Sequence, residues 1–591
     1  MIRAGPPSGA GFALPPWTRA QAVLTLLRVL ALPLVLTLQP AAASMPVAAT
    51  APAAPALVRP LLERPWVEYR TPGFSLYSDL DEAQALASVR DIERFAIVVR
   101  DAVGLGQRVS PIPVEFWLCS DASTVVRLAG DATLLGFMRP SPRASYLVAT
   151  ASALADPGGS PMLHEYVHLL VRSAGVRGTA VVDTGVVEAG ASVLDRTHAE
   201  DAVLDLPRWY DEGLAEFLAT LRVRDGEVRI GVPNRRRLEQ LRMRDPLFMN
   251  IGQVLAVTDV GALPSFRVAE FYALSWVLVH WAHARDWAAR GARPGDSAGT
   301  EPMLQSAAID DYLRRVSAGE PVRAAARAAF GSDLRSVNER LFAHADRLRP
   351  APILRLPVAR FAGLDVEPRV TRRVLDGYEA AWRLGYVALG GGQRHGADGD
   401  EETARALFGH ALQLRPFDLR AEMGLAVADQ FEARFAEGVA RARRIHAAAP
   451  DDTLLAQELA DMLYEWCDSD APPADCEVLH EEAIRLYEGI LRVAPARIET
   501  HAALGGALLH ARADPARARL HLRRAHAAMP FSAVLVLQLG VAELRLGNMA
   551  VAERLLRRAE RWSESARMGR RVRTALIELG CRGGAAAPTT C

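Results

Sequence analysis

Polar and apolar residues alternate in the segment 66–79, WVEYRTPGFSLYSD, on both sides of Pro72 and Gly73. This pattern is typical of two paired strands joined by a tight turn. Helical spacing of apolar residues follows from Asp81 to Val103, and the runs PIPVEFWLC and RASYLVATA predict two further strands. Because the spacing is then mostly helical as far as residue 348, we expect an α+β region with a small strand-containing N-terminal part.

The last third of the chain repeats a helical pattern. A small residue, a large residue and a third residue recur at fixed offsets before a closing proline, which allows two helices to pack closely. The spacing predicts about five tetratricopeptide-type units over 373–565, an all-α solenoid whose concave surface binds a protein partner; an unrelated helical bundle is the alternative. The prolines and the preceding positions are Pro416, Pro450, Pro495 and Pro530, with Ala404, Phe408 and Ala411; Ala483, Tyr487 and Ile490; and Ala518, Leu522 and Ala525.

The first 43 residues predict a signal peptide. A Pro-, Gly- and Ala-rich run with Arg19 and Arg28 precedes the apolar stretch 29–38 and the small residues 41–44. A charged flank, a short apolar core and an A-x-A site predict export to the periplasm or the extracellular space, with cleavage near Ala43. The apolar stretch is too short to span a bilayer, and no later run is long enough, so we predict no stable membrane span; an uncleaved anchor is the alternative.

Five cysteines suit an exported chain. Cys467 and Cys476 bracket the insert CDSDAPPADC, and Cys581 and Cys591 bracket the C-terminal tail, so each pair is a candidate local disulfide, although the sequence does not fix the connectivity. Cys119, in VEFWLC, is predicted to be a buried small hydrophobic residue and not a nucleophile.

The absence of lysine and the balance of charges exclude several classes of protein. The 69 basic residues are all arginine and are balanced by 69 acidic residues. Without lysine the chain has no Walker-A lysine, no pyridoxal Schiff-base lysine and no kinase strand lysine. A net charge of zero also argues against a general nucleic-acid binder, and we predict no nucleic-acid partner.

The segment MLHEYVHLLV carries candidate metal chemistry. His164 and His168 are four residues apart and share one face of a helix, so both imidazoles can bind one metal ion with Glu165 beside the open coordination position. Neutral imidazole is a good zinc ligand, and a catalytic zinc site has three protein ligands and a water molecule. The third ligand is expected in RWYDEGLAEFLATL, where Glu212 and Glu216 also share a helical face.

H-E-x-x-H followed by W-x-D/N-E-G-x-A-E resembles the gluzincin metallopeptidases, the thermolysin and aminopeptidase clan, and particularly the peptidase-MA-like proteins that are fused to helical repeats. The resemblance covers about residues 64–348. It implies that His164, His168 and Glu212 bind Zn²⁺, that Glu165 is the general base and that Glu216 orients a ligand.

Two features depart from the family pattern. The connection between His168 and Glu212 is longer than is typical of the clan and contains the insert 173–205, which offers alternative ligands. RVAEFYALSWVLVHWA resembles the aminopeptidase Y-x-x-G helix, whose tyrosine stabilises the oxyanion, but Ser275 replaces the glycine. Tyr272 is the candidate for that role; the alternative is that its ring only packs in the core. The other candidates are Asp183, Glu188 and His198 as ligands, and His280 and His283 as substitutes for Tyr272.

The sequence therefore predicts an exported zinc-dependent peptidase that acts on a peptide or protein substrate. No Gly-x-Met-Glu-Asn signature precedes His164, which favours an endopeptidase. The alternative is a non-catalytic exported scaffold with a vestigial metallopeptidase domain. The predicted division is a signal peptide at 1–43, a Pro/Ala-rich linker at 44–62, the gluzincin-like domain at 63–348, a linker at 349–372, repeats at 373–565 and a tail at 566–591.

Overall fold

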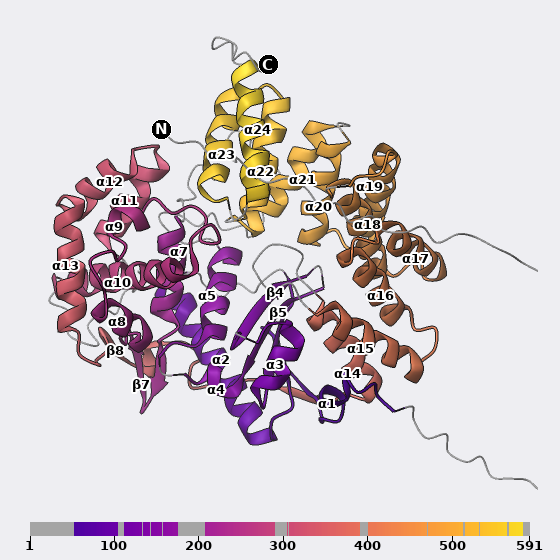
Figure 1. The fold of residues 1–591 in the computed structure, drawn as a ribbon, viewed down its shortest axis with the longest axis horizontal. Helices are drawn as coiled ribbons and strands as arrows, with labels where there is room; N and C mark the ends of the chain where they lie inside the picture. Colours follow the sequence, from indigo (N-terminus) through magenta and orange to yellow (C-terminus); the bar gives the residue numbers. More distant parts are fainter. Residues whose placement is uncertain are drawn as a thin grey trace, which may run out of the picture. The chain divides into compact units, whose positions relative to one another are not determined.

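The computed structural model describes residues 53–104, 112–132, 134–141, 143–156, 158–174, 207–289, 304, 306–389, 400–469, 471–511, 514–530, 532–563 and 566–582. The predicted signal peptide, the first part of the linker at 44–62 and Cys591 lie outside these residues, so those predictions stay predictions. Within the described ranges the fold is mostly helical, with two small sheets before the helical solenoid (Figure 1). None of the described helices is both long and apolar enough to cross a membrane.

A six-stranded mixed sheet has the strand order β4-β5-β3-β2-β1-β9. The predicted strand pair around Pro72 and Gly73 is present as β1 and β2, with Arg70 opposite Ser75. β3 pairs in parallel with β2 and β5, whereas the β1–β2, β1–β9 and β4–β5 pairs are antiparallel. The strands are β1 Val67–Arg70, β2 Ser75–Ser78, β3 Val114–Cys119, β4 Gly136–Pro140, β5 Ser145–Thr150 and β9 Thr371–Val374.

Both faces of this sheet are covered. Along β3, Phe116 and Leu118 belong to one apolar core, and Trp117 and Cys119 belong to another, because successive side chains of a strand point to opposite faces. A strand that is buried on both sides needs apolar residues on both faces, which explains why Phe116 to Cys119 form a continuous apolar run. Cys119 is a free, fully buried thiol, as predicted.

The first core joins the sheet to the helices of the N-terminal half. α2 matches the predicted helix and is capped by Asp81, whose carboxylate accepts a hydrogen bond from the Gln84 N–H. The helices of this half are α1 Arg59–Leu62, α2 Glu82–Ala102, α3 Ala122–Ala129, α4 Ala151–Leu154, α5 Pro161–Ala174, α7 Arg208–Leu218, α8 Arg235–Arg242, α9 Ile251–Val254, α10 Ser265–Ala289, α11 Ala307–Ser317, α12 Val322–Phe330 and α13 Leu334–Arg347.

A second, three-stranded antiparallel sheet has two strands in the region where the spacing predicts mainly helices and one strand beyond it. It consists of β6 Arg222–Arg224, β7 Glu227–Ile230 and β8 Leu354–Pro357. β8 falls in the segment 349–372, which the sequence predicts as a linker, and β9 begins at the end of that segment. Each strand is too short to give a clear period, and β8 and β9 pair with partners that are distant in the chain.

The solenoid is built from successive helices that pack as pairs and follow one another from α14 to α24 (Figure 1). The four repeat prolines each stand two residues beyond the last residue of a helix, namely α15, α17, α19 and α21. The helices are α14 Gly377–Ala388, α15 Glu401–Leu414, α16 Leu419–Phe431, α17 Phe435–Ala448, α18 Thr453–Cys467, α19 Cys476–Val493, α20 Ile498–His510, α21 Pro515–Ala528, α22 Ala533–Arg545, α23 Met549–Arg561 and α24 Ala566–Arg582.

The recurring small and large residues of the repeats are buried where paired helices meet. Ala518, Leu522 and Ala525 are fully buried on α21. A Cβ added at Gly505 of α20 would lie 2.5 Å from Leu522 Cγ, so only glycine allows this approach. The repeat spacing therefore reflects a packing requirement, and the C-terminal region is a solenoid of paired helices.

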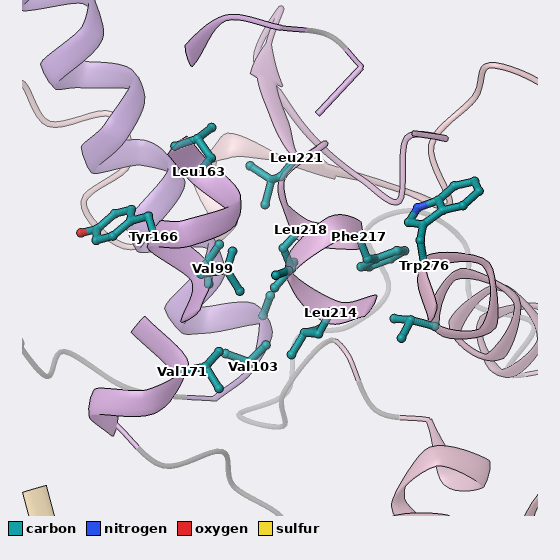
Figure 2. Close-up of a cluster of buried hydrophobic side chains, with 14 of the residues drawn as sticks. Val99, Val103, Leu163, Tyr166, Val171, Leu214, Phe217, Leu218, Leu221 and Trp276 are labelled. Atoms are coloured by element: carbon teal, nitrogen blue, oxygen red, sulfur yellow. The ribbon is translucent and has the colours of Figure 1, made fainter. Parts of the chain in front are cut away.

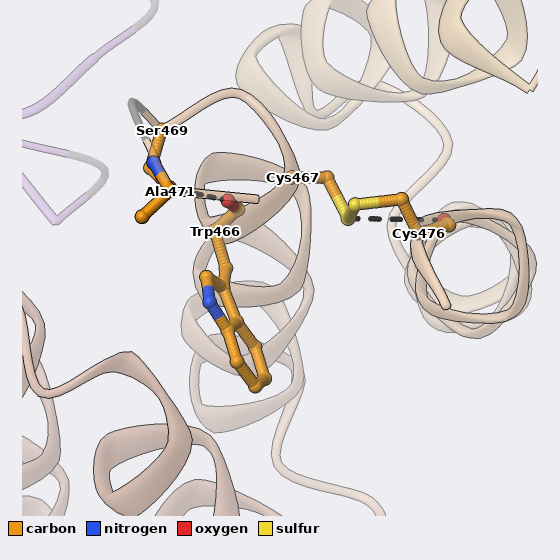
Figure 3. The surroundings of a disulfide bond; sticks show 5 residues. All are labelled: Trp466, Cys467, Ser469, Ala471 and Cys476. Carbon is orange, nitrogen blue, oxygen red and sulfur yellow. Dashed lines mark hydrogen bonds between the residues drawn. A yellow bond between two sulfur atoms is a disulfide. The ribbon is translucent and has the colours of Figure 1, made fainter. Parts of the chain in front are cut away.

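The insert between α18 and α19 is closed by a disulfide between Cys467 and Cys476, with Cα atoms 5.5 Å apart (Figure 3). Asp468, which follows Cys467, accepts a hydrogen bond from the Arg571 guanidinium of α24 at 3.3 Å. α24 lies in the segment that the sequence assigns only as a tail. The disulfide thus holds a loop whose first residue contacts the last described helix.

The second core joins the sheet to the first solenoid helices, since it contains Trp117 and Val148 of the strands together with Trp382 and Leu384 of α14. The turn between β4 and β5 adds polar contacts. The guanidinium of Arg143 donates two hydrogen bonds to the carboxylate of Glu458 on α18, both at 2.6 Å, and a third to the Tyr386 hydroxyl at 2.9 Å. Arg143 and Glu458 are both buried, with side chains 7% and 5% exposed.

Candidate metal centre

Helix α5 carries the first two candidate ligands, His164 and His168. Ser160 caps its start, because the Ser160 hydroxyl accepts a hydrogen bond from the Leu163 N–H and the Ser160 carbonyl accepts one from the His164 N–H. Pro161 occupies the first helical position, where its missing N–H is no loss.

The apolar side of α5 fixes the helix against the sheet. Tyr166 packs edge to face on Phe116 of β3, with ring centroids 4.9 Å apart. Leu163, Tyr166 and Val171 lie among buried apolar side chains that also include Leu218 of α7 (Figure 2). α5 therefore has little freedom to rotate, and its imidazoles keep their direction.

Helix α7 supplies the third candidate ligand. Every residue from Trp209 to Leu218 is buried, so both Glu212 and Glu216 lie inside the protein. A buried carboxylate is costly unless a positive charge or a metal ion is close to it. Glu216 is paired with Arg237 at 2.6 Å, whereas Glu212 faces the two buried histidines, and this arrangement indicates a site for a cation.

The three candidate ligand atoms lie close together. His164 Nε2 is 3.1 Å from His168 Nε2 and 3.1 Å from Glu212 Oε2, and His168 Nε2 is 3.3 Å from the same oxygen. Ligands at zinc distances of about 2.0–2.1 Å in a tetrahedron are about 3.3–3.4 Å apart, so the triangle is nearly the right size for Zn²⁺. Among the described residues these three form the one group of histidine, cysteine and carboxylate side chains that is able to hold a metal ion.

Asp211 is a site residue that the sequence analysis did not assign. Its Oδ1 lies 2.9 Å from His168 Nδ1, the imidazole nitrogen that faces away from the candidate metal position. A carboxylate on this nitrogen fixes the tautomer and the ring orientation of a metal-binding histidine. In the sequence, Asp211 could have been found as the acidic residue that directly precedes E-G-x-A-E. Glu216, which the resemblance places in such a role, lies 3.6 Å from His164 Nδ1.

The charges of the cluster compensate one another. Burial disfavours the charged form of His168, but Asp211 and then Glu212 outweigh it and raise the pKa of His168 to about 10. Burial likewise opposes ionisation of Glu212, yet the adjacent histidines lower the pKa of its carboxyl below the usual range. The carboxylates therefore favour a positive charge at this position, which a divalent cation would supply in place of the imidazole protons.

Glu165 and Tyr272 are the remaining candidate residues of the predicted site. Glu165 is half-buried on α5 between the two histidines. Tyr272, on α10, has its ring centroid 6.0 Å from that of His164. Burial, followed by the charges of Glu212 and Glu165, raises the pKa of the Tyr272 phenol well above its ordinary value, so the hydroxyl keeps its proton and can donate a hydrogen bond.

The two histidines of α10 that were candidate substitutes for Tyr272, His280 and His283, are buried. His280 Nε2 lies 3.2 Å from the Gly231 carbonyl and His280 Nδ1 lies 2.9 Å from His344 Nε2. His283 is buried and stacks on Phe217, with ring centroids 5.4 Å apart. The alternative ligands Asp183, Glu188 and His198 lie outside the described residues.

Gly213 allows α7 to approach α10. A Cβ built on Gly213 would lie 2.5 Å from the Ser275 carbonyl oxygen and 2.8 Å from its carbon, so a larger residue would push the two backbones apart. This contact gives a physical reason for the glycine in E-G-x-A-E. On α10 the contacted residue, Ser275, lies one turn after Tyr272.

Gly213→Ala should lower the free energy of unfolding by about 1–3 kcal/mol, because the added methyl meets backbone that cannot turn away. Denaturant unfolding measures this change. Gly409→Ala is the matched control: Gly409 lies inside α15 with no atom near its Cβ position, and alanine there should be neutral or stabilising by up to about 1 kcal/mol. Equal midpoints for Gly213→Ala and the wild type would contradict this explanation.

No protein-family model matches the sequence, and no curated protein matches it. Solved structures of tetratricopeptide proteins share a local likeness. PilF of Pseudomonas aeruginosa is 18% identical, with a TM-score of 0.28 over 34% of this chain and 83% of that chain. A thermophilic tetratricopeptide protein of Thermus thermophilus is 19% identical, with a TM-score of 0.26 over 34% of this chain and 99% of that chain.

MamA of Desulfovibrio magneticus RS-1 is 13% identical, with a TM-score of 0.25 over 31% of this chain and 94% of that chain. At such TM-scores the likeness carries no argument about activity.

Proposed function

We propose that this chain is an exported zinc-dependent peptidase, most simply an endopeptidase, and that its solenoid recruits a protein partner or substrate. The observation that carries the proposal is the triangle of His164 Nε2, His168 Nε2 and Glu212 Oε2, with Glu165 next to His164 on α5. Two imidazoles and one carboxylate fit the donor preference of Zn²⁺ and leave a position open for water.

The chemistry that Zn²⁺ supplies in such a site is polarisation of the scissile carbonyl and activation of a water molecule. Glu165 accepts a proton from that water as the water oxygen bonds to the carbonyl carbon. Glu165 then delivers this proton to the amide nitrogen as the C–N bond breaks, so the products are a carboxylic acid and an amine. Tyr272, which keeps its proton, donates a hydrogen bond to the oxygen on which negative charge develops.

Export to the periplasm or the extracellular space agrees with the predicted signal peptide and with the cysteines. The Cys467–Cys476 disulfide requires an oxidising compartment to persist.

The experiment is a zinc and cleavage assay on the purified full chain. We expect one zinc ion per chain by elemental analysis and cleavage of a mixed peptide library that a chelator abolishes and added Zn²⁺ restores. Zinc without cleavage would support the scaffold instead, and an absence of zinc would refute the metal site. The cleavage pattern distinguishes an endopeptidase from an exopeptidase.

A further inference from the structure

Glu216 is held at both of its carboxylate oxygens by residues outside its own helix. Asn234 donates a hydrogen bond from Nδ2 to Glu216 Oε2 at 2.7 Å, and Arg237 donates one to Glu216 Oε1 at 2.6 Å. The Arg237 and Glu216 side chains are only 13% and 9% exposed. Because two donors hold two different oxygens, the plane of the carboxylate is fixed, and Oε1 keeps its place 3.6 Å from His164 Nδ1.

Asn234 connects this contact to the start of α8. Its Oδ1 accepts a hydrogen bond from the Arg237 N–H at 3.1 Å and caps the helix, while its Nδ2 donates to Glu216. The same side chain therefore positions the first turn of α8 and, through it, the Arg237 guanidinium. The cap and the contact with Glu216 form one arrangement.

Arg237 also reaches the candidate oxyanion donor. Its guanidinium carbon lies 4.9 Å from the centroid of the Tyr272 ring, a cation–π distance. One side chain therefore contacts the carboxylate beside His164 and the face of Tyr272. The positive charge of Arg237 offsets the negative charge of Glu216, which is buried near the carboxylate of Glu212.

We infer that Asn234 and Arg237 are positioning residues of the metal centre, which act through Glu216 to orient the His164 imidazole and hold the ring of Tyr272 beside it. This inference rests on the proposed zinc site. Partners of metal-binding histidines fix the ring and its tautomer, and their loss typically weakens metal binding by about 10–100-fold. Neither residue belongs to H-E-x-x-H or E-G-x-A-E.

The test measures Zn²⁺ binding alone, by chelator competition on the purified full chain, with the visible spectrum of the Co²⁺-loaded protein as a second readout. Arg237→Met should weaken Zn²⁺ binding by about 10–100-fold and alter the Co²⁺ bands, because the carboxylate beside His164 is free to turn. Arg237→Lys, which retains a charge but not the planar fork, should restore part of the affinity. Asn234→Ser retains a capping oxygen but removes the amide donor, so it should also weaken binding.

Arg235→Met is the matched control, since Arg235 is on the same helix, is 84% exposed and pairs only with Glu239 among the described residues. It should bind Zn²⁺ as the wild type does. If Arg237→Met does not fold, as judged by circular dichroism, Asn234→Ser and Arg237→Lys carry the test. Wild-type affinity and spectra in the folded variants would overturn the inference.

The wild-type protein separates this inference from the proposed function. If the wild type binds Zn²⁺ without cleaving peptides, and the variants bind it more weakly, the peptidase proposal fails and the positioning role stands. If the wild type binds no Zn²⁺, both fail together.

Discussion

Glu165→Gln is expected to reduce peptide cleavage by about 10²–10⁴-fold while the zinc content stays that of the wild type. The amide has nearly the shape of the carboxylate but cannot accept the proton of the attacking water. Glu165 is not one of the three clustered ligand residues, so its replacement leaves the donor set intact. Initial rates on a peptide substrate and elemental analysis of the same sample measure both quantities.

Glu239→Gln makes the same chemical change on the exposed face of α8, where Glu239 pairs with Arg235, and should cleave as the wild type does. Wild-type rates for Glu165→Gln would remove Glu165 from the mechanism. Loss of zinc together with activity would show instead that Glu165 supports the metal site, and the role of general base would then have no support.

Arg143→Met is expected to lower the free energy of unfolding by about 3–5 kcal/mol. The substitution removes both hydrogen bonds that hold Glu458 and leaves a carboxylate that is 5% exposed without its cation. It also removes the guanidinium that lies 4.1 Å from the centroid of the Tyr386 ring. Urea unfolding followed by circular dichroism measures the loss.

Two further variants separate the buried charge from the loss of a side chain. Arg143→Met combined with Glu458→Leu should recover much of the stability, since an apolar pair often replaces a buried ion pair without cost. Arg314→Met removes an arginine that is 66% exposed and pairs with Asp311, and it should cost less than about 1 kcal/mol. A single Arg143→Met variant as stable as Arg314→Met would show that the buried pair contributes little.

Local patterns were enough to predict the elements whose apolar period is long or whose partner is close in sequence. The β1–β2 pair, α2 and the repeat helices meet this condition, and so does the placement of His164 and His168 on one helix. The meeting of α5 with α7 was predicted only through the resemblance, because the intervening segment is long. The structure brings Glu212 to the two histidines, whereas their role as metal ligands stays a prediction.

Features that depend on contacts between distant residues were not predicted. β8 and β9 are four-residue strands that pair with partners far back in the chain, and no local pattern identifies such partners. Asp211 was visible in the sequence, but its hydrogen bond to His168 depends on the packing of two helices. The Arg143–Glu458 pair likewise requires the turn of one sheet to meet a helix more than three hundred positions later.

The second core limits which parts of the chain can be exchanged by recombination. Trp117 of the sheet shares a buried core with Trp382 and Leu384 of the first solenoid helix, and β9, just before that helix, forms the edge of the same sheet. A recombination event that exchanged the repeats for another binding module would strip one face of the sheet and remove its edge strand. The exchange would also break the Arg143–Glu458 pair, so the helices α14 to α16, which share this core, and Glu458 of α18 must change together with the sheet.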